Sequence, residues 1–165
     1  AELDALVDTQ PTEQLDALLS KRQSLINVLK RRLDAGELTY ARYLSTSQQV
    51  FSSALDNLHE VAVAYESIST IDETYIDRRL AELDADDSDA ASAARERETL
   101  ERRRELRTTQ RRRIAQFLAQ NESALTALDR TTTALADVPI GKQPEDVDAA
   151  MAALEELADR AAKYA

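Results

Sequence analysis

Residues 84–89, Asp-Ala-Asp-Asp-Ser-Asp, stand between two long stretches of heptad-patterned sequence, 37–84 and 89–138. Short polar side chains favour turns and helix N-caps over helix interiors, so this cluster predicts a tight reversal of the chain. At 1.5 Å per residue, each flanking stretch forms a rod of about 70–75 Å if it is helical. We therefore expect two long antiparallel helices, joined at a tip formed by residues 84–89.

Both rods carry apolar residues at alternating intervals of three and four, which is the spacing of a helix that packs against other helices. In the first rod this pattern runs unbroken until Ser69 and Thr70 interrupt it. Thr70 and Glu73 have the spacing of a capping box, which predicts either a kink or the start of a new helix. The expected seam residues are Tyr40, Leu44, Ser47, Phe51, Leu55, Leu58, Ala62, Tyr65 and Ile68 in the first rod and Ile114, Leu118, Asn121, Leu125, Leu128, Thr132 and Leu135 in the second.

The position of the tip also predicts the register between the two rods. A reversal near Asp86 places Leu58 at the level of Ile114 and Phe51 close to the level of Asn121. Polar residues on an apolar seam more often set register and pairing than perform chemistry. We therefore interpret Asn121 as a packing residue that makes room for an aromatic ring.

Two shorter helical stretches flank the rods, residues 11–35 and 144–165, and each has a proline near its start. Each is about half as long as a rod and joins the base of the hairpin through a short loop. The short helices therefore cover only the lower half of the hairpin.

The predicted fold is all-α, an antiparallel four-helix bundle base with a projecting two-helix coiled-coil hairpin. The chain is expected to form a single helical domain, 1–165. Its bundle base comprises residues 1–67 and 109–165, and its coiled-coil stalk comprises residues of about 68–108.

Composition excludes several kinds of site. The chain has no cysteine, so it has neither disulfides nor thiolate metal sites, and two glycines are too few for a glycine-rich phosphate loop. The single histidine, His59, cannot complete a di-iron site. His59 and Met151 fall about 20 Å apart along the bundle, too far to share a haem, so Met151 is interpreted as core filler.

The tip resembles the opening of a calcium-binding EF-hand loop through Asp84, Asp86 and Ser88. Such a loop also needs Gly at its sixth position and Glu at its twelfth, where this chain has Asp89 and Arg95. A capping turn is therefore favoured, with weak cation binding as the alternative. We expect no cofactor, no metal site and no catalytic residues, because no nucleophile and base can be paired.

Residues 95–113 contain nine arginines and four glutamates, in a chain with a net charge of −10. This basic stretch returns alongside the most acidic stretch, 37–94, so the two are expected to neutralise each other. Exposed ion pairs contribute about 0–1 kcal/mol each, yet several together can fix the register of a hairpin. The expected pairing sets Arg95, Arg97 and Arg102 against Asp72, Glu73, Asp77 and Glu82.

These features favour a non-enzymatic helical scaffold or adaptor module that mediates protein–protein interaction. Its partner is expected to be another protein or a second copy, bound through the stalk, where few apolar residues lie between Ile68 and Ile114. The candidate interaction surface comprises Arg103, Arg104, Arg107, Arg111, Arg112, Tyr65, Ile68 and Leu106.

Two alternatives remain open. The arginines of 95–113 could bind an anionic surface, nucleic acid or lipid headgroups, although interleaved glutamates and the acidic chain make nucleic acid a less favoured partner. The chain could also be an extracytoplasmic helical domain of a membrane protein, although it has no apolar run long enough to span a bilayer. The arginine bias and the unfinished ends favour a domain of a larger bacterial protein, with the cytoplasm as the favoured compartment.

Overall fold

The computed structural model describes residues 9–33, 38–85, 90–137 and 151–159, and its regular elements in these ranges are helices. The all-α prediction is therefore confirmed. The helices are α1 (Gln10–Arg32), α2 (Leu38–Ile68), α3 (Glu73–Ala85) and α4 (Ala90–Asp137), followed by a helical segment over residues 151–159.

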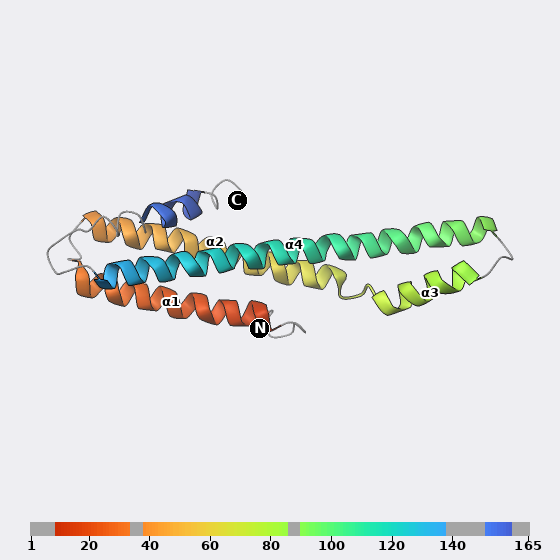
Figure 1. Ribbon diagram of the computed structural model, residues 1–165, viewed down its shortest axis with the longest axis horizontal. Coiled ribbons are helices and arrows are strands. Elements are labelled where there is room, and N and C mark those ends of the chain that lie inside the picture. The colour runs from red at the N-terminus through yellow and green to blue at the C-terminus, as the bar shows by residue number, and fades with distance from the viewer. Residues whose placement is uncertain (1–8, 34–37, 86–89, 138–150, 160–165) are drawn as a thin grey trace.

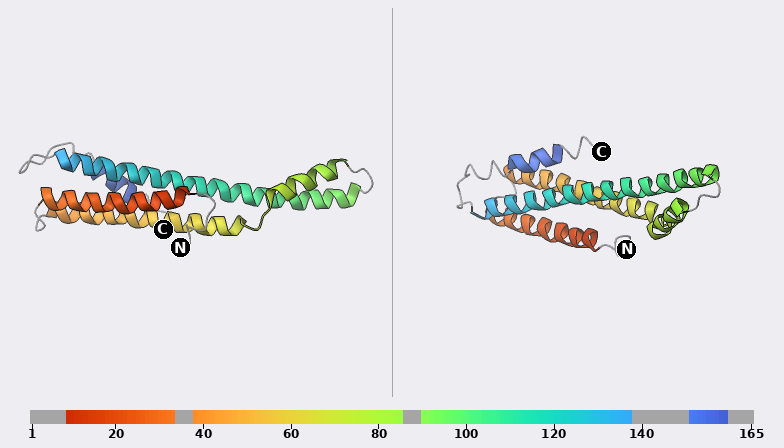
Figure 2. Two further views of the ribbon diagram at one scale, coloured as in Figure 1. Left: turned by 90° about the horizontal axis from the view of Figure 1, so that it is seen from below. Right: turned by 45° about the vertical axis from the view of Figure 1, so that its right-hand side comes forward.

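The helices form one long hairpin with shorter elements along part of it (Figure 1). α2 and α3 make one limb and α4 makes the other, and α1 and the segment 151–159 lie along the same half (Figures 1 and 2). α1, α2 and α4 pack against one another, whereas α3 packs against α4. We call the half covered by α1 the base, and the part formed by α3 and the facing stretch of α4 the arm.

A large hydrophobic core fills the base. It joins the apolar faces of α1, α2, α4 and the segment 151–159, where Met151 is 2% exposed and Leu154 is 0% exposed. The predicted seam of α4 is confirmed from Ile114 to Leu135, except that Thr131, not Thr132, is fully buried. The rest of the predicted helix 144–165, residues 144–150 and 160–165, lies outside the described residues.

The predicted seam of α2 is rotated relative to the buried stripe. Ala54 and Ala64 are 1% and 3% exposed, whereas the predicted Leu55 and Tyr65 are half-buried. Large side chains dominate a pattern search, but small residues let two helices approach closely and so occupy the centre of this contact. The residues of α2 that are buried are Tyr43, Thr46, Ser47, Val50, Phe51, Ala54, Leu58, Val61, Ala64 and Ile68.

A second, smaller core holds the arm together. Ile76 of α3 is 0% exposed and packs with Leu83 and with Leu100 of α4. Among the partly buried residues, Ile71 packs against both this cluster and the core of the base. Burial of each aliphatic side chain contributes about 1.5–3 kcal/mol, so a cluster of three holds the arm far less firmly than the base is held.

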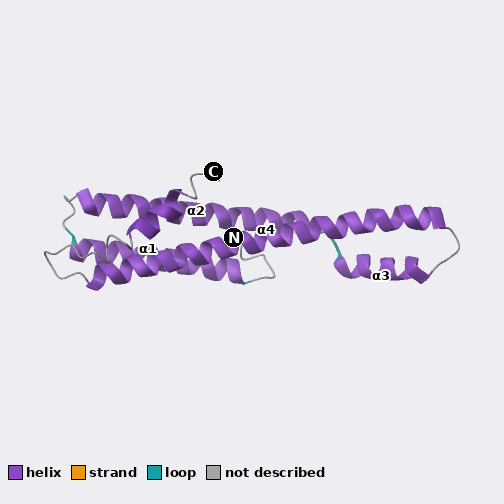
Figure 3. Cartoon of the chain, turned by 45° about the horizontal axis from the view of Figure 1, so that its top comes forward, coloured by secondary structure: helices purple, strands orange, loops and turns teal. Residues whose placement is uncertain are grey.

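The limb formed by α2 and α3 is broken between the two helices (Figure 3). The prediction of an interruption at residue 70 is confirmed, and it is a helix break, with residues 69–72 outside both helices. The predicted capping residue is wrong: Asp72, not Thr70, accepts a hydrogen bond from the Tyr75 N–H through Oδ1, at 3.0 Å. Glu73 is the first residue of α3, so Asp72, which precedes it, occupies the N-cap position of that helix.

Buried amides fix the register of α2, α1 and α4. Asn121 is 0% exposed and donates from Nδ2 to the Ala54 carbonyl at 3.1 Å, while Asn57 Nδ2 donates to Asn121 Oδ1 at 3.0 Å. Gln14 of α1, 3% exposed, donates to the Leu118 carbonyl at 3.0 Å. These hydrogen bonds couple side chains of three helices at one level of the base.

The predicted register is wrong by about one helical turn, because Ala54 and Asn57 occupy the level expected for Phe51. α3 continues through Asp84 to Ala85 and α4 begins at Ala90, so the reversal is centred later than Asp86. Each residue of displacement at the tip moves the facing residues by two. The predicted tip, residues 84–89, begins too early, because Asp84 and Ala85 belong to α3; its other residues, 86–89, lie outside the described residues.

Candidate interaction surface on the arm

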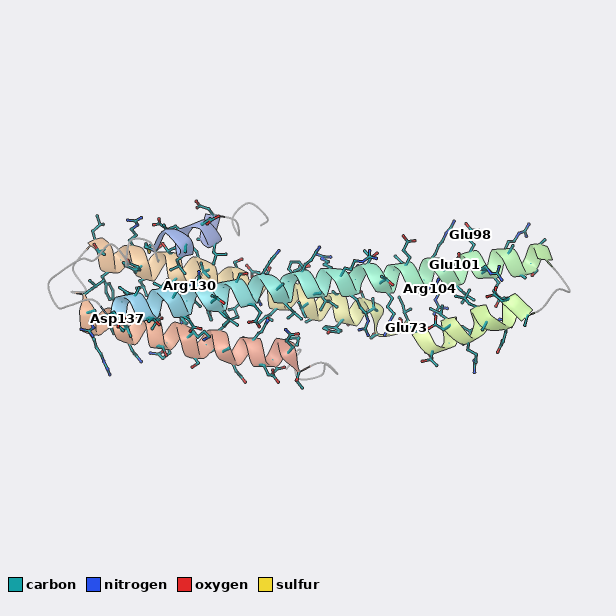
Figure 4. The ribbon with its side chains drawn as sticks, viewed as in Figure 1. Glu73, Glu98, Glu101, Arg104, Arg130 and Asp137 are labelled. Carbon is teal, nitrogen blue, oxygen red and sulfur yellow. The ribbon has the colours of Figure 1, made fainter. Side chains whose placement is uncertain are left out.

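One side of the arm carries a ladder of ion pairs between α3 and α4. Arg107 Nε lies 3.0 Å from Glu73 Oε2, Arg104 Nη1 lies 3.9 Å from Asp77 Oδ1, and Arg97 pairs with Asp84. In Figure 4, Arg104 lies on the face of α4 that is turned toward α3, and Glu73 lies near the start of α3. Glu98 lies on the opposite face of α4. We call this the ladder side.

Arginines of the basic stretch therefore do pair with carboxylates of the acidic limb, as predicted, but the individual pairs differ from those expected. Arg97 pairs with Asp84, and Arg102 pairs with Glu98 of its own helix at 2.5 Å. The shifted register accounts for the difference, because each arginine of α4 faces a carboxylate closer to the tip than expected.

The other side of the arm has a bidentate pair of the opposite polarity. Arg79 of α3 donates from Nε to Glu96 Oε1 at 2.6 Å and from Nη2 to Oε2 at 2.9 Å. Hydrogen bonds from Arg79 lower the pKa of the Glu96 carboxyl, and the pKa of Arg79 is raised, first by Glu96 and then by Glu82. A planar guanidinium that contacts both carboxylate oxygens fixes the orientation of α3 on α4.

Acid is expected to loosen the arm through Glu96. Its pKa is depressed in the folded chain, so the stabilisation is present above the unfolded pKa and is lost as the pH falls through the folded value. We expect Glu96→Gln to lower the melting temperature at neutral pH, and this difference from the wild type to vanish in acid. Circular dichroism melts of both proteins across the acid range measure it. A difference that stays constant with pH would contradict the assignment.

Arg107 serves the fold rather than an exposed surface. Its side chain is 19% exposed, and besides pairing with Glu73 it donates from Nη1 to the Ile71 carbonyl at 2.5 Å. Arg107 thus holds the non-helical residues between α2 and α3 against α4. Its place in the predicted surface is corrected accordingly, because its charge is already compensated within the chain.

Ile68 is also removed from the predicted surface, because it is 4% exposed and belongs to the core of the base. Its predicted place on the seam of the first rod is confirmed, and a residue buried in that seam is not available to an exposed surface.

Tyr65 and Arg111 lie together in a shallow groove of about 480 Å³ at the end of α1. The groove lies at the N-terminal end of α1, where α2 and α4 extend beyond α1 toward the arm. Arg111 follows Arg104 by one heptad, so the groove lies on the ladder side of the hairpin. The groove is lined by Gln10, Tyr65, Arg111, Ile114, Ala115, Leu118, Ala119 and Glu122.

Leu106 is 60% exposed and lies on the side of the hairpin away from the groove. It precedes Arg113 by one heptad, and Arg113 pairs with Glu60 of α2 at 2.7 Å on that side. Val63, 46% exposed, follows Glu60 by three residues and shares this side. We call it the Leu106 side.

Tyr75 extends the Leu106 side onto α3. It is 40% exposed and precedes Arg79 by four residues, so it lies on the side where Arg79 meets Glu96. The sequence prediction did not include Tyr75 or Val63. Their spacing from charged residues that pair across the hairpin is the signal that identifies them, and this signal requires the register to be known.

The remaining candidates lie apart from one another. Arg112 is exposed, on a different face of α4 from Leu106, and Arg103 is half-buried beside Leu106. Within the described ranges neither arginine forms an ion pair with a described carboxylate. The eight predicted residues therefore do not form one surface: Leu106 and Arg103 share one side, and Tyr65, Arg104 and Arg111 share the other.

Comparison with known protein families, curated proteins and solved structures finds no match to this chain. Within the part of the chain that the structure describes, no group of three or more His, Asp or Glu side chains is arranged to hold a metal ion. The described helices include none that is long and apolar enough to cross a bilayer. The function of the chain is therefore inferred from its own residues and contacts.

Proposed function

We propose that this chain is a non-enzymatic helical scaffold or adaptor module whose arm binds another protein. In this proposal α1, α2, α4 and the C-terminal helix form a four-helix bundle that holds the arm, a two-helix coiled-coil hairpin. The observation that carries the proposal is the exposure of Leu106 and Tyr75 on an arm that the shorter helices do not cover. Contiguous exposed apolar groups mark protein-binding surfaces, and in this proposal Leu106 and Tyr75 form one such group.

The use of the arginines supports protein binding over binding to an anionic surface. Arg97, Arg104 and Arg107 pair with carboxylates of α3, and Arg113 pairs with a carboxylate of α2. Each of these pairs removes a cation from the set that could neutralise phosphates. The stretch that is most basic in sequence is therefore much less basic as a surface.

Site-specific photo-cross-linking in the native cells tests the proposal. A photoreactive phenylalanine analogue at Leu106 or Tyr75 is expected to give a discrete adduct with a second protein or a second copy. Both side chains are exposed, so the substitutions leave the packing unchanged.

Leu19 is the matched control, because it is a leucine of the base with 49% exposure. The same analogue at Leu19 should give no adduct. Adducts that form equally from Leu19 and Leu106, or that form from neither arm position, would overturn the proposal.

A further inference from the structure

The arm and the base meet at a joint, which we define by residues 69–72 on one limb and residues 103–110 of α4 on the other. In the first limb the helix is broken here, because residues 69–72 belong to neither α2 nor α3. α4, in contrast, runs as one helix from Ala90 to Asp137. One limb of the hairpin can therefore change its length at the joint, and the other can follow by bending.

The seam of α4 becomes polar at the joint. Leu100 belongs to the core of the arm and Ile114 to the core of the base, and each is 4% exposed. The seam positions between them, at intervals of three and four, are Arg103, Arg107 and Gln110, all of them half-buried. Burial of apolar surface is the main source of packing free energy, so α4 is held less firmly at the joint than on either side of it.

Buried polar atoms without hydrogen bonds are concentrated at the joint. Two of the three such side-chain atoms among the described residues are Gln110 Oε1 and Arg107 Nε, and the third is Gln14 Oε1 in the base. Arg107 Nε lies 3.0 Å from Glu73 Oε2, so this contact is an ion pair without a hydrogen bond from Nε. A buried polar atom that lacks a partner destabilises the contact in which it lies.

Few contacts connect the two cores across the joint. Among the described residues, Ile71 is the one that packs against both of them. Arg107 of α4 donates from Nη1 to the Ile71 carbonyl at 2.5 Å, and it pairs with Glu73 at the start of α3. Arg107 therefore holds both the residue that links the cores and the first residue of α3.

We propose that the joint is a hinge on which the arm pivots as a unit, and that Arg107 sets its resting angle. The small core of the arm and the bidentate pair of Arg79 with Glu96 keep α3 on α4 during the motion. α4 accommodates the motion by a gentle bend over the turns between its two cores, and residues 69–72 accommodate it by backbone rotation. The inference concerns the motion of the arm, so it goes beyond the proposed function and does not depend on it.

Pulsed electron paramagnetic resonance on the chain of residues 1–165 tests the hinge. The chain has no cysteine, so two exposed residues replaced by cysteine take the only spin labels. The distance distribution across the joint should be roughly twice as broad as the distributions within the base and within the arm. The labelled pairs are Ala81 with Ala119 across the joint, Ser45 with Ala119 within the base, and Thr74 with Ala94 within the arm.

Variants of the joint then test the role of its polar residues. Arg107→Met removes the cation, so it should shift and further broaden the distribution across the joint and leave the other two unchanged. Gln110→Leu replaces the unpaired amide by an apolar side chain of similar size. It should narrow the distribution across the joint and raise the melting temperature by about 2–4 °C. Arg112→Met is the matched control, because Arg112 is exposed on another face of α4, and it should change none of the three distributions.

Three results would overturn the inference. The first is a distribution across the joint as narrow as the other two, because the hairpin would then be one rigid rod. The second is an equal effect of Arg107→Met and Arg112→Met. The third is a distribution within the arm that broadens together with the one across the joint, because α3 would then detach from α4 instead of pivoting with it. Photo-cross-linking tests partner binding separately, so none of these results bears on the proposed function.

Discussion

Replacing Ile76 with alanine is expected to unfold α3 while the base stays folded. Ile76 is 0% exposed and forms the small core of the arm with Leu83 and Leu100. Truncation of a buried isoleucine costs about 2–5 kcal/mol, from lost burial and from the cavity that remains. A cluster of three buried side chains has little further packing to offset such a loss.

Hydrogen exchange followed by mass spectrometry measures this effect by segment. Amides of residues 73–85 should exchange roughly 30-fold faster or more in Ile76→Ala, whereas amides of α1 keep their protection. Leu106→Ala, which truncates an exposed leucine of the same arm, should leave both segments unchanged. An equal loss of protection in α1 and α3 would show instead that arm and base unfold together.

Replacing Asn121 with alanine is expected to destabilise the base by about 2–3 kcal/mol. The change removes the hydrogen bonds to the Ala54 carbonyl and from Asn57, and it leaves a cavity at a position that is 0% exposed. Urea unfolding followed by circular dichroism should show a lower midpoint with an unchanged slope. This loss should be among the largest that a single polar residue of the chain produces.

Asn27 is the matched control for Asn121. It is an exposed asparagine of α1 that accepts a hydrogen bond from Gln23 of the same helix. Asn27→Ala should therefore alter the free energy of unfolding by no more than about 0.5 kcal/mol. Equal effects of the two substitutions would mean that the buried amide contributes nothing beyond helix propensity.

The helices, the break and the reversal could be predicted from the sequence because each has a local cause. Heptad spacing predicts helices, and the polar cluster at 84–89 marks the end of both limbs. The partners across the hairpin could not be predicted as reliably. They depend on which residue is central at the tip, and an error of one residue there displaces the facing residues by two.

The candidate surface shows the same division between local and non-local causes. Leu106 lies off the buried stripe of α4 that contains Leu100 and Ile114, so local helical periodicity accounts for its exposure. The engagement of Arg107 with Ile71 and Glu73 depends on how the non-helical residues after α2 cross α4. The division of Tyr65 and Leu106 between opposite sides likewise appears only once the two limbs are aligned.

The separation of the two hydrophobic cores has a consequence for how the reach of the molecule can change. Apart from Ile71, the arm and the base share no residue of their buried clusters among the described residues. Inserting seven residues into α3 and seven into the facing stretch of α4 would lengthen the hairpin by about 10 Å and preserve the orientation of every face. The length of the arm can therefore change by whole heptads while the packing of the base stays the same.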